Sequence, residues 1–152
     1  MEITAPVGNW ESLQAAIRSG ADSVYFGVGL LNMRARSSMN FTLRDLVRIT
    51  RTCHRHRVAA YLTLNIVIYG QEIRERKRVV DSAKKNGVDA VIASDQAVVQ
   101  YARSIGMRVH MSTQTNISNL EAVRYWSQFA DVMVIARELS LDQVANIARA
   151  VK

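Results

Sequence analysis

The sequence predicts an α/β fold, an incomplete (β/α)8 barrel made of six β-α units. Short runs of β-branched and other apolar residues alternate with longer helical segments along the chain, which is typical of parallel α/β proteins. The strand runs lack polar alternation, so we expect the strands to be buried on both faces. A short motif that recurs before every second strand is the third observation, and it bears on the kind of sheet.

Six strands are expected from these runs. The first ends at Pro6, which fixes its own φ angle and has no amide proton to donate. The third is the longest and is rich in apolar residues along its length. The predicted strands cover residues 2–5, 23–26, 58–64, 90–93, 108–111 and 132–135.

Capping residues mark the starts of the helices between these strands. Asn9 can cap the first helix, and Ser94 or Asp95 can cap the fourth. Gly20 and Gly87 supply left-handed helix ends. Runs that resemble capping boxes open three more helices, at residues 42–45, 118–121 and 140–143. The expected helices cover residues 10–19, 42–57, 71–85, 95–105, 118–129 and 140–152.

An internal repeat distinguishes the even strands from the odd ones. Gly-Ala-Asp-Ser-Val at 20–24 precedes the second strand, Gly-Val-Asp-Ala-Val at 87–91 the fourth, and Ala-Asp-Val at 130–132 the sixth. Side-chain layers inside a (β/α)8 barrel come from alternate strands. A doubly wound open parallel sheet, which is the alternative, gives no reason for such alternation. The repeat therefore favours the barrel.

Six units fall short of the eight that a barrel needs. We therefore expect residues 1–152 to form a single truncated barrel domain that belongs to a longer protein. The missing wall would leave the first and sixth strands as unpaired edges beside apolar surface, and such edges invite pairing with another chain. We expect self-association or a missing C-terminal domain.

The composition indicates a globular chain and excludes several classes of protein. Of the 152 residues, 49% are hydrophobic and 22% are charged, close to the average for folded domains. The single cysteine, Cys53, excludes a disulfide framework, a four-thiolate zinc site and a self-contained iron–sulfur cluster. The apolar runs are too short for a membrane helix and no signal peptide is evident, so we expect no membrane contact.

Polar residues follow the predicted strands, at the rim where active sites of α/β sheets and barrels lie. Ser112, Gln114 and Asn116 form a dense run directly after the fifth strand. Arginines and helix N-termini at this rim would suit a carboxylate or phosphate, so we expect a small anionic ligand. The alternative is that strand-end loops are polar in any protein. The candidate ligand residues are Arg34, Arg36, Asn65, Asp95, Ser112, Gln114, Asn116, Arg137 and Glu138.

The positive charge is concentrated in one segment. Between Arg44 and Lys85 there are 11 basic and 4 acidic residues, whereas the rest of the chain is balanced. Two consecutive helices carry this charge, so they could form one surface that contacts the phosphates of RNA. A solvated outer face is the alternative. The candidate nucleic-acid contacts are Arg44, Arg48, Arg51, Arg55, Arg74, Lys77, Arg78, Lys84 and Lys85.

No motif identifies a catalytic residue, so the catalytic residues stay unassigned. The chain contains neither Gly-x-Ser-x-Gly nor His-Glu-x-x-His. Cys53 lies among apolar helix positions, which predicts a buried structural thiol. His110 lies inside the fifth strand, where a core histidine is expected rather than a catalytic one. One cysteine without a carboxylate at ligand spacing predicts no metal site.

Several short runs resemble the collagenase-like peptidases of family U32. They occur in register from residue 2 to about 142, so the resemblance covers nearly the whole chain. The opening run, Glu-Ile-Thr-Ala-Pro-Val-Gly-Asn, is among the longest. The matching runs are 2–9, 20–27, 32–36 with 40–42, 64–65, 94–95, 112–116 with Asn119 and Ala122, and 136–140.

The resemblance implies an N-terminal barrel-like domain of a bacterial or archaeal cytoplasmic protein. Members of the family are described as peptidases, and therefore as hydrolases. Other members take part in oxygen-independent, prephenate-linked hydroxylation of transfer RNA, ribosomal RNA or ubiquinone precursors, and some of those carry an iron–sulfur cluster. The cysteine-containing C-terminal signature of the family is absent from residues 1–152, so no cofactor is expected in this segment.

Two functions follow from the resemblance. The first is a segment of a collagenase-like peptidase that is inactive alone. The alternative is a segment of an RNA-modification protein that binds RNA through its basic helices.

Overall fold

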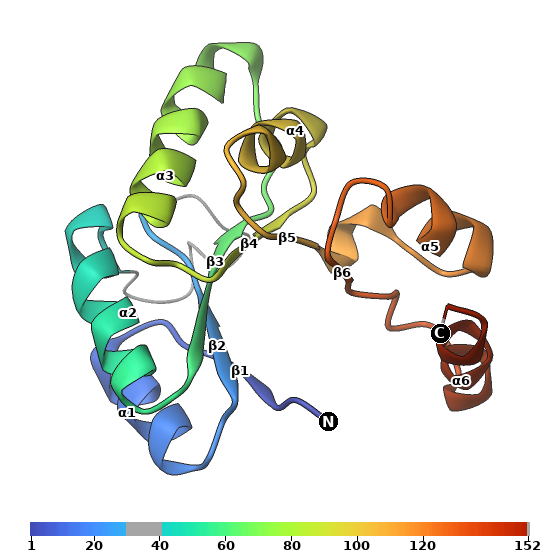
Figure 1. Cartoon of the computed structure of the whole chain (residues 1–152), viewed down its shortest axis with the longest axis horizontal. Coiled ribbons are helices and arrows are strands. Elements are labelled where there is room, and N and C mark those ends of the chain that lie inside the picture. The colour runs from blue at the N-terminus through green and yellow to red at the C-terminus, as the bar shows by residue number, and fades with distance from the viewer. Residues whose placement is uncertain (30–40, 152) are drawn as a thin grey trace.

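The computed structural model describes residues 1–29 and 41–151, and helices alternate with strands throughout this part of the chain (Figure 1). The strands are β1 (Thr4–Pro6), β2 (Ser23–Phe26), β3 (Ala59–Leu64), β4 (Ala90–Ala93), β5 (Val109–Met111) and β6 (Val132–Met133). The helices are α1 (Trp10–Arg18), α2 (Leu46–Arg55), α3 (Ile73–Lys85), α4 (Gln96–Ser104), α5 (Leu120–Trp126) and α6 (Leu141–Ala150). Short 3-10 turns η1 (Leu43–Asp45), η2 (Gly70–Glu72) and η3 (Thr113–Thr115) precede α2, α3 and α5. The six β-α units predicted from the sequence are confirmed.

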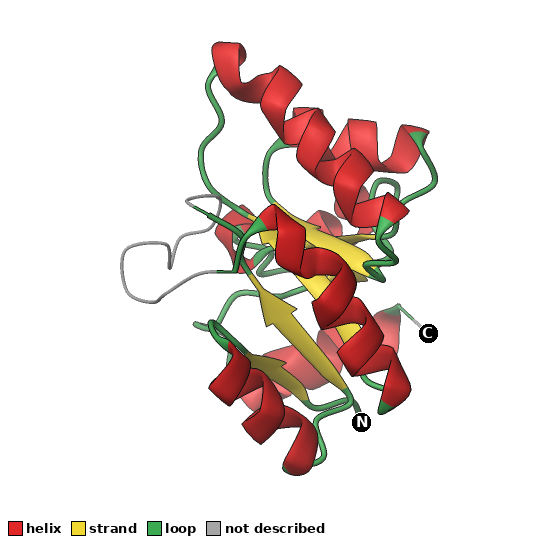
Figure 2. Cartoon of the chain, turned by 90° about the vertical axis from the view of Figure 1, so that its left-hand side faces the viewer, coloured by secondary structure: helices red, strands yellow, loops and turns green. Residues whose placement is uncertain are grey.

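The strands form one parallel sheet in the order β1-β2-β3-β4-β5-β6. A doubly wound sheet would reverse its strand order at a switch point, so the doubly wound alternative is wrong for this chain. The sheet curls into an arc with the helices on its outer side, as in half of a (β/α)8 barrel (Figures 1 and 2). The predicted barrel-type fold is confirmed.

The hydrophobic core lies between the convex face of the sheet and the helices. Alternate strand side chains point to this face, including Phe26, Leu62 and Met111, which are almost fully buried. Helices α2 and α3 pack onto them with apolar residues such as Ile49 and Val80. The strands are therefore uniformly apolar on one face only.

The concave face is buried in the central strands, as the sequence predicted, with all of β5 and all but one residue of β3 buried. Its side chains are mainly polar or aromatic and include Tyr25, Thr63 and His110. The sequence analysis did not recognise this polar face because the strands have only two to six residues, too few for alternation to stand out. Helices cover one face, and the polar side chains occupy the other.

The repeat that precedes each even strand is a hydrogen-bonded clamp. In each copy the aspartate carboxylate accepts from a backbone N–H next to or within the preceding odd strand, at 2.7–2.8 Å. The backbone N–H of the same aspartate donates to the carbonyl of that residue at 2.8–2.9 Å. The pairs are Asp22 with Ile3, Asp89 with Ala60, and Asp131 with Val109. The repeat therefore fixes strands two by two at their N-terminal ends.

Strands β1 and β6 are the two edges of the described sheet. Near β6, Val132 and Val134 each expose 38% of their surface, and on α6 Leu141 exposes 87%. Helix α6 has no buried residue and lies at the open end of the arc (Figure 1). Within the described part of the chain, no helix has the length and hydropathy needed to cross a membrane.

The aspartate clamp predicts a specific loss of stability. Asp131→Ala leaves the Val109 N–H without its acceptor, so the free energy of unfolding should fall by about 1–3 kcal/mol. Asp131→Asn keeps an acceptor oxygen and should lose less. Urea unfolding of the three proteins measures the difference. Equal stabilities of the alanine variant and the parent would contradict a role for the clamp.

The exposed edges predict concentration-dependent association of the 152-residue chain. Apolar side chains beside an unpaired strand favour contact with a second copy. We expect the sedimentation coefficient to rise with concentration, and Val134→Lys combined with Leu141→Lys to reduce the effect. A monomer at all concentrations that binds no hydrophobic dye would show that six units seal their own surface.

Candidate functional site

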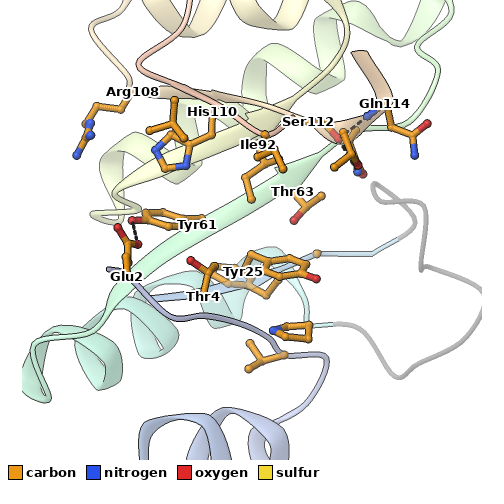
Figure 3. A pocket seen from close by; sticks show the side chains of 18 of the residues that line it. Glu2, Thr4, Tyr25, Tyr61, Thr63, Ile92, Arg108, His110, Ser112 and Gln114 are labelled. Atoms are coloured by element: carbon orange, nitrogen blue, oxygen red, sulfur yellow. Dashed lines mark hydrogen bonds between the residues drawn. The ribbon is translucent and has the colours of Figure 1, made fainter. Parts of the chain in front are cut away.

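The concave face of the sheet encloses a cavity of about 1000 Å³. All six strands contribute to its wall, mostly through side chains that alternate with those of the core. Thr63, Ile92 and His110 point toward its middle from three neighbouring strands (Figure 3). A cavity of this size suits a ligand of small-molecule dimensions.

Four of the predicted rim residues meet in this wall: Asn65, Ser112, Gln114 and Arg137. The side-chain amide of Asn65 donates to Ser112 Oγ at 3.2 Å, and the backbone N–H of Gln114 donates to the same oxygen at 3.3 Å. Ser112 is only 2% exposed, whereas Gln114 and Arg137 are exposed. Ser112 thus joins β3 to the loop after β5.

Three more of the predicted rim residues, Asp95, Asn116 and Glu138, are not among the described residues that line the cavity. Asp95 caps α4, where its carboxylate accepts from the N–H groups of Ala97 and Val98 at 2.9 and 3.2 Å. Asn116 ends the turn η3 in the left-handed conformation, at φ 50°. Glu138 is exposed and does not line the cavity. Arg34 and Arg36 lie outside the described residues.

A second polar group lies at the end of the cavity opposite Gln114 (Figure 3). The Tyr61 hydroxyl donates to Glu2 Oε1 at 2.9 Å, and the Tyr61 ring meets the His110 ring edge-on, with centroids 4.6 Å apart. Hydrogen bonds from Ser23 and Tyr61 lower the pKa of Glu2, so it stays ionised. Burial and the bond to Glu2 raise the pKa of Tyr61, so its proton stays in place.

His110 lines the cavity, although the sequence analysis did not count it among the candidate site residues. It is 6% exposed, as expected for a core histidine, but it lines the cavity and does not point into the helix layer. Burial, reinforced by the Arg108 guanidinium, lowers the pKa of His110, so the imidazole is neutral at pH 7. One feature of the sequence could have indicated this placement. His110 alternates with Arg108 and Ser112, and residues at alternate positions of a strand face the same side.

The described wall offers hydrogen bonds and charge but no assembled nucleophile. The Ser112 hydroxyl contacts Asn65 and Gln114, not a histidine. Glu2 is the one carboxylate among the described lining residues. Across residues 1–29 and 41–151, no three His, Cys, Asp or Glu side chains gather as a metal site would require. The arrangement suits binding of a polar or anionic molecule.

The candidate nucleic-acid residues lie on the outer surface of α2 and α3 and in η1, and all nine are exposed. Two of them also pack on aromatic rings of neighbouring helices. The Arg48 guanidinium lies 4.1 Å from the Trp10 ring centroid, and the Lys77 ammonium lies 4.9 Å from that of Tyr101. These contacts hold the two side chains in place. The charged surface and the cavity are on opposite sides of the sheet.

Fold and cavity together define the class of this chain, a (β/α)-barrel protein with its candidate site on the inner face. The family model described as "Peptidase family U32" matches residues 8–152. The chain therefore belongs to peptidase family U32.

Relatives and structures agree with this assignment. The chain is 57% identical to a collagenase of Porphyromonas gingivalis, over 96% of this chain and 35% of the relative. It is 36% identical to an uncharacterized protease, MJ0090, of Methanocaldococcus jannaschii, over 100% of this chain and 37% of the relative. It is 31% identical to a tRNA hydroxylation protein P of Helicobacter pylori, over 99% and 36%.

A solved structure of the U32 peptidase Mk0906 has the same fold. It superposes with a TM-score of 0.79 at 13% identity, covering 100% of this chain and 66% of that one. The chain spans about a third of the length of the curated relatives it matches.

The environment of Cys53 predicts an unreactive thiol. Burial raises its pKa to about 11, so the thiolate is scarce at neutral pH. We expect no alkylation by iodoacetamide at pH 8 in the folded chain and rapid alkylation in urea. Because the folded pKa is raised, the chain should lose stability as pH rises from the ordinary thiol pKa of 9.0 toward about 11. Rapid alkylation without urea would contradict the buried environment.

Proposed function

We propose that this chain is the substrate-binding barrel segment of a collagenase-like peptidase and that it does not cleave peptides alone. The observation that carries the proposal is the 57% identity to a collagenase over 96% of the chain. The tRNA hydroxylation relative is 31% identical over a similar span. The cavity on the concave face is the place proposed for the substrate.

The chemistry of the cavity supports a binding role. The residues that line it include Asn65, Ser112 and Arg137, which carry an amide, a hydroxyl and a guanidinium. Such groups can bind the carbonyls and carboxylates of a peptide. The described wall lacks a nucleophile paired with a base, which is why the proposal assigns cleavage to the longer protein.

This proposal predicts a change in substrate binding by the intact parent protein. Arg137→Ala removes a cation from the rim, so KM for a collagen-derived peptide should rise about tenfold with little change in kcat. Arg18→Ala, an exposed arginine at the end of α1, is the matched control. Release of peptide ends from gelatin measures cleavage. The proposal fails if the intact parent cleaves no protein substrate.

RNA binding is a second candidate function, favoured by the exposed cations of α2 and α3 and the hydroxylation relative. Lysine and arginine side chains that contact phosphates release counterions, so their number sets the salt dependence of binding. In this case the chain would be a segment of an RNA-modification protein. The cavity would then hold the part of the RNA or of a second substrate that reacts.

The RNA hypothesis predicts a salt-dependent affinity for transfer RNA. Arg51→Glu with Arg55→Glu, two exposed residues of α2, should weaken binding for all RNA sequences alike. Arg18→Glu with Arg149→Glu, two exposed arginines outside α2 and α3, is the control for the same change of net charge. Fluorescence anisotropy across a range of salt concentrations measures the slope. No binding at low salt would leave the basic helices as a solvated face.

A further inference from the structure

We propose that the middle of the concave cavity binds a carboxylic acid along the row of Thr63, Ile92 and His110, with its carboxylate at the Thr63 end and its apolar body over Ile92. The inference rests on the proposed function, because it names the substrate chemistry of the same cavity. The carboxylate can belong to a peptide C-terminus or to a small organic acid, and the experiment below separates the two.

Two buried polar atoms in this part of the wall have no hydrogen-bond partner among the described residues: Thr63 Oγ1 and His110 Nε2. Thr63 is 7% exposed and His110 is 6% exposed. An unpaired buried polar group lowers stability by about 1–3 kcal/mol, so native proteins rarely keep one without a reason. A carboxylate at the Thr63 end of the cavity would supply the partner that Thr63 lacks, and the rest of the ligand would extend toward His110.

The register of the sheet places these atoms on either side of one apolar residue. Thr63 pairs with Ile92, and Ile92 pairs with His110, so the three side chains form one row across β3, β4 and β5. Two strand spacings put the ends of the row about 10 Å apart. Figure 3 shows Ile92 between the other two side chains. A ligand along this row meets a polar group at each end and an apolar surface between them.

Ser112 adds a third donor beside this row. Its Oγ accepts two hydrogen bonds, from Asn65 and from the backbone of Gln114, so its own proton remains to be donated. Ser112 lies two residues after His110 on the same strand side, so both face the cavity. A carboxylate is an acceptor of several hydrogen bonds and matches this donor-rich wall.

The charges of the described wall also favour an anion. Arg108 and Arg137 line the cavity, and the one described carboxylate, Glu2, accepts a hydrogen bond from Tyr61. The wall beside the row is aromatic and aliphatic, with Tyr25, Tyr61 and Val132. An acid with an apolar body therefore fits better than an inorganic anion or a sugar.

Calorimetric titration of the 152-residue chain tests the proposal with four probes. They are 3-phenylpropionate, its amide, the tripeptide Gly-Gly-Phe and the amide of that tripeptide. We expect at least one acid to bind, and its amide to bind about tenfold or more weakly, because hydrogen bonds to a charged group are lost. Binding of the tripeptide alone assigns the site to peptide ends, and binding of phenylpropionate alone assigns it to small acids.

Two variants test the position of the site. Thr63→Val should weaken binding of the acid about tenfold or more, whereas Thr52→Val, which removes a hydroxyl from helix α2, should leave it unchanged. Thr63→Val should also raise the unfolding temperature of the free chain, because it removes an unpaired buried hydroxyl. If Thr63→Val does not fold, Ser112→Ala replaces it, with the same expected direction in affinity.

The proposal is overturned if acid and amide bind equally, if neither acid binds, or if a folded Thr63→Val or Ser112→Ala chain binds as the parent does. These outcomes are separate from the test of peptidase function, since binding is measured on this chain and cleavage on the intact parent. Carboxylate binding without any proteolysis by the parent rejects the peptidase function and retains the site.

Discussion

The winding of the sheet is the constraint on which the rest of this structure depends. Six parallel strands pair in the order in which the chain makes them, and the helices lie on the outer face. The apolar side chains that hold the domain together must therefore point outward, as Leu62 and Met111 do. The inner face has no helix to bury it and is free to carry polar groups. Polar residues of the inner face that lie far apart in sequence, from Glu2 to Arg137, thereby share one cavity.

Much of this arrangement could be predicted from the sequence, because local signals were strong. Asn9, Asp95 and Ser140 cap the helices that they were expected to open, or in the case of Asp95 share in opening. The repeated aspartate motif predicted the barrel, although the observed reason is different. Asp22 and its counterparts do not build interior layers; they clamp backbone groups of adjacent strands. A motif that recurs at every second strand can reflect either interior side-chain layers or hydrogen bonds between paired strands. The spacing of the motif alone does not distinguish the two.

The candidate site was predicted in part. A physical cause separates the residues that were predicted correctly from those that were not. Residues directly after strands, such as Asn65 and Ser112, are carried to the cavity by the strand that precedes them. Asp95 also follows a strand, but a helix starts there and takes its carboxylate as a cap. His110 was expected in the core because a strand of three residues reveals no face. The pairing of β5 with β4 and β6 decides which face His110 lies on. These contacts join residues far apart in the sequence, so the local sequence does not reveal them.

Family membership and geometry together describe a barrel segment whose inner face retains unpaired polar groups. The unpaired polar atoms of Thr63 and His110 lower the stability of the free chain. Their presence is explained if a ligand occupies this part of the cavity. Titration of the His110 imidazole by NMR tests this claim most directly. The account predicts a pKa below the ordinary value of about 6.5 in the free chain, because the ring is buried, and shifted imidazole signals with 3-phenylpropionate or Gly-Gly-Phe bound, because the ligand then extends toward the ring. An imidazole that titrates at its ordinary pKa and does not respond to either acid would contradict it.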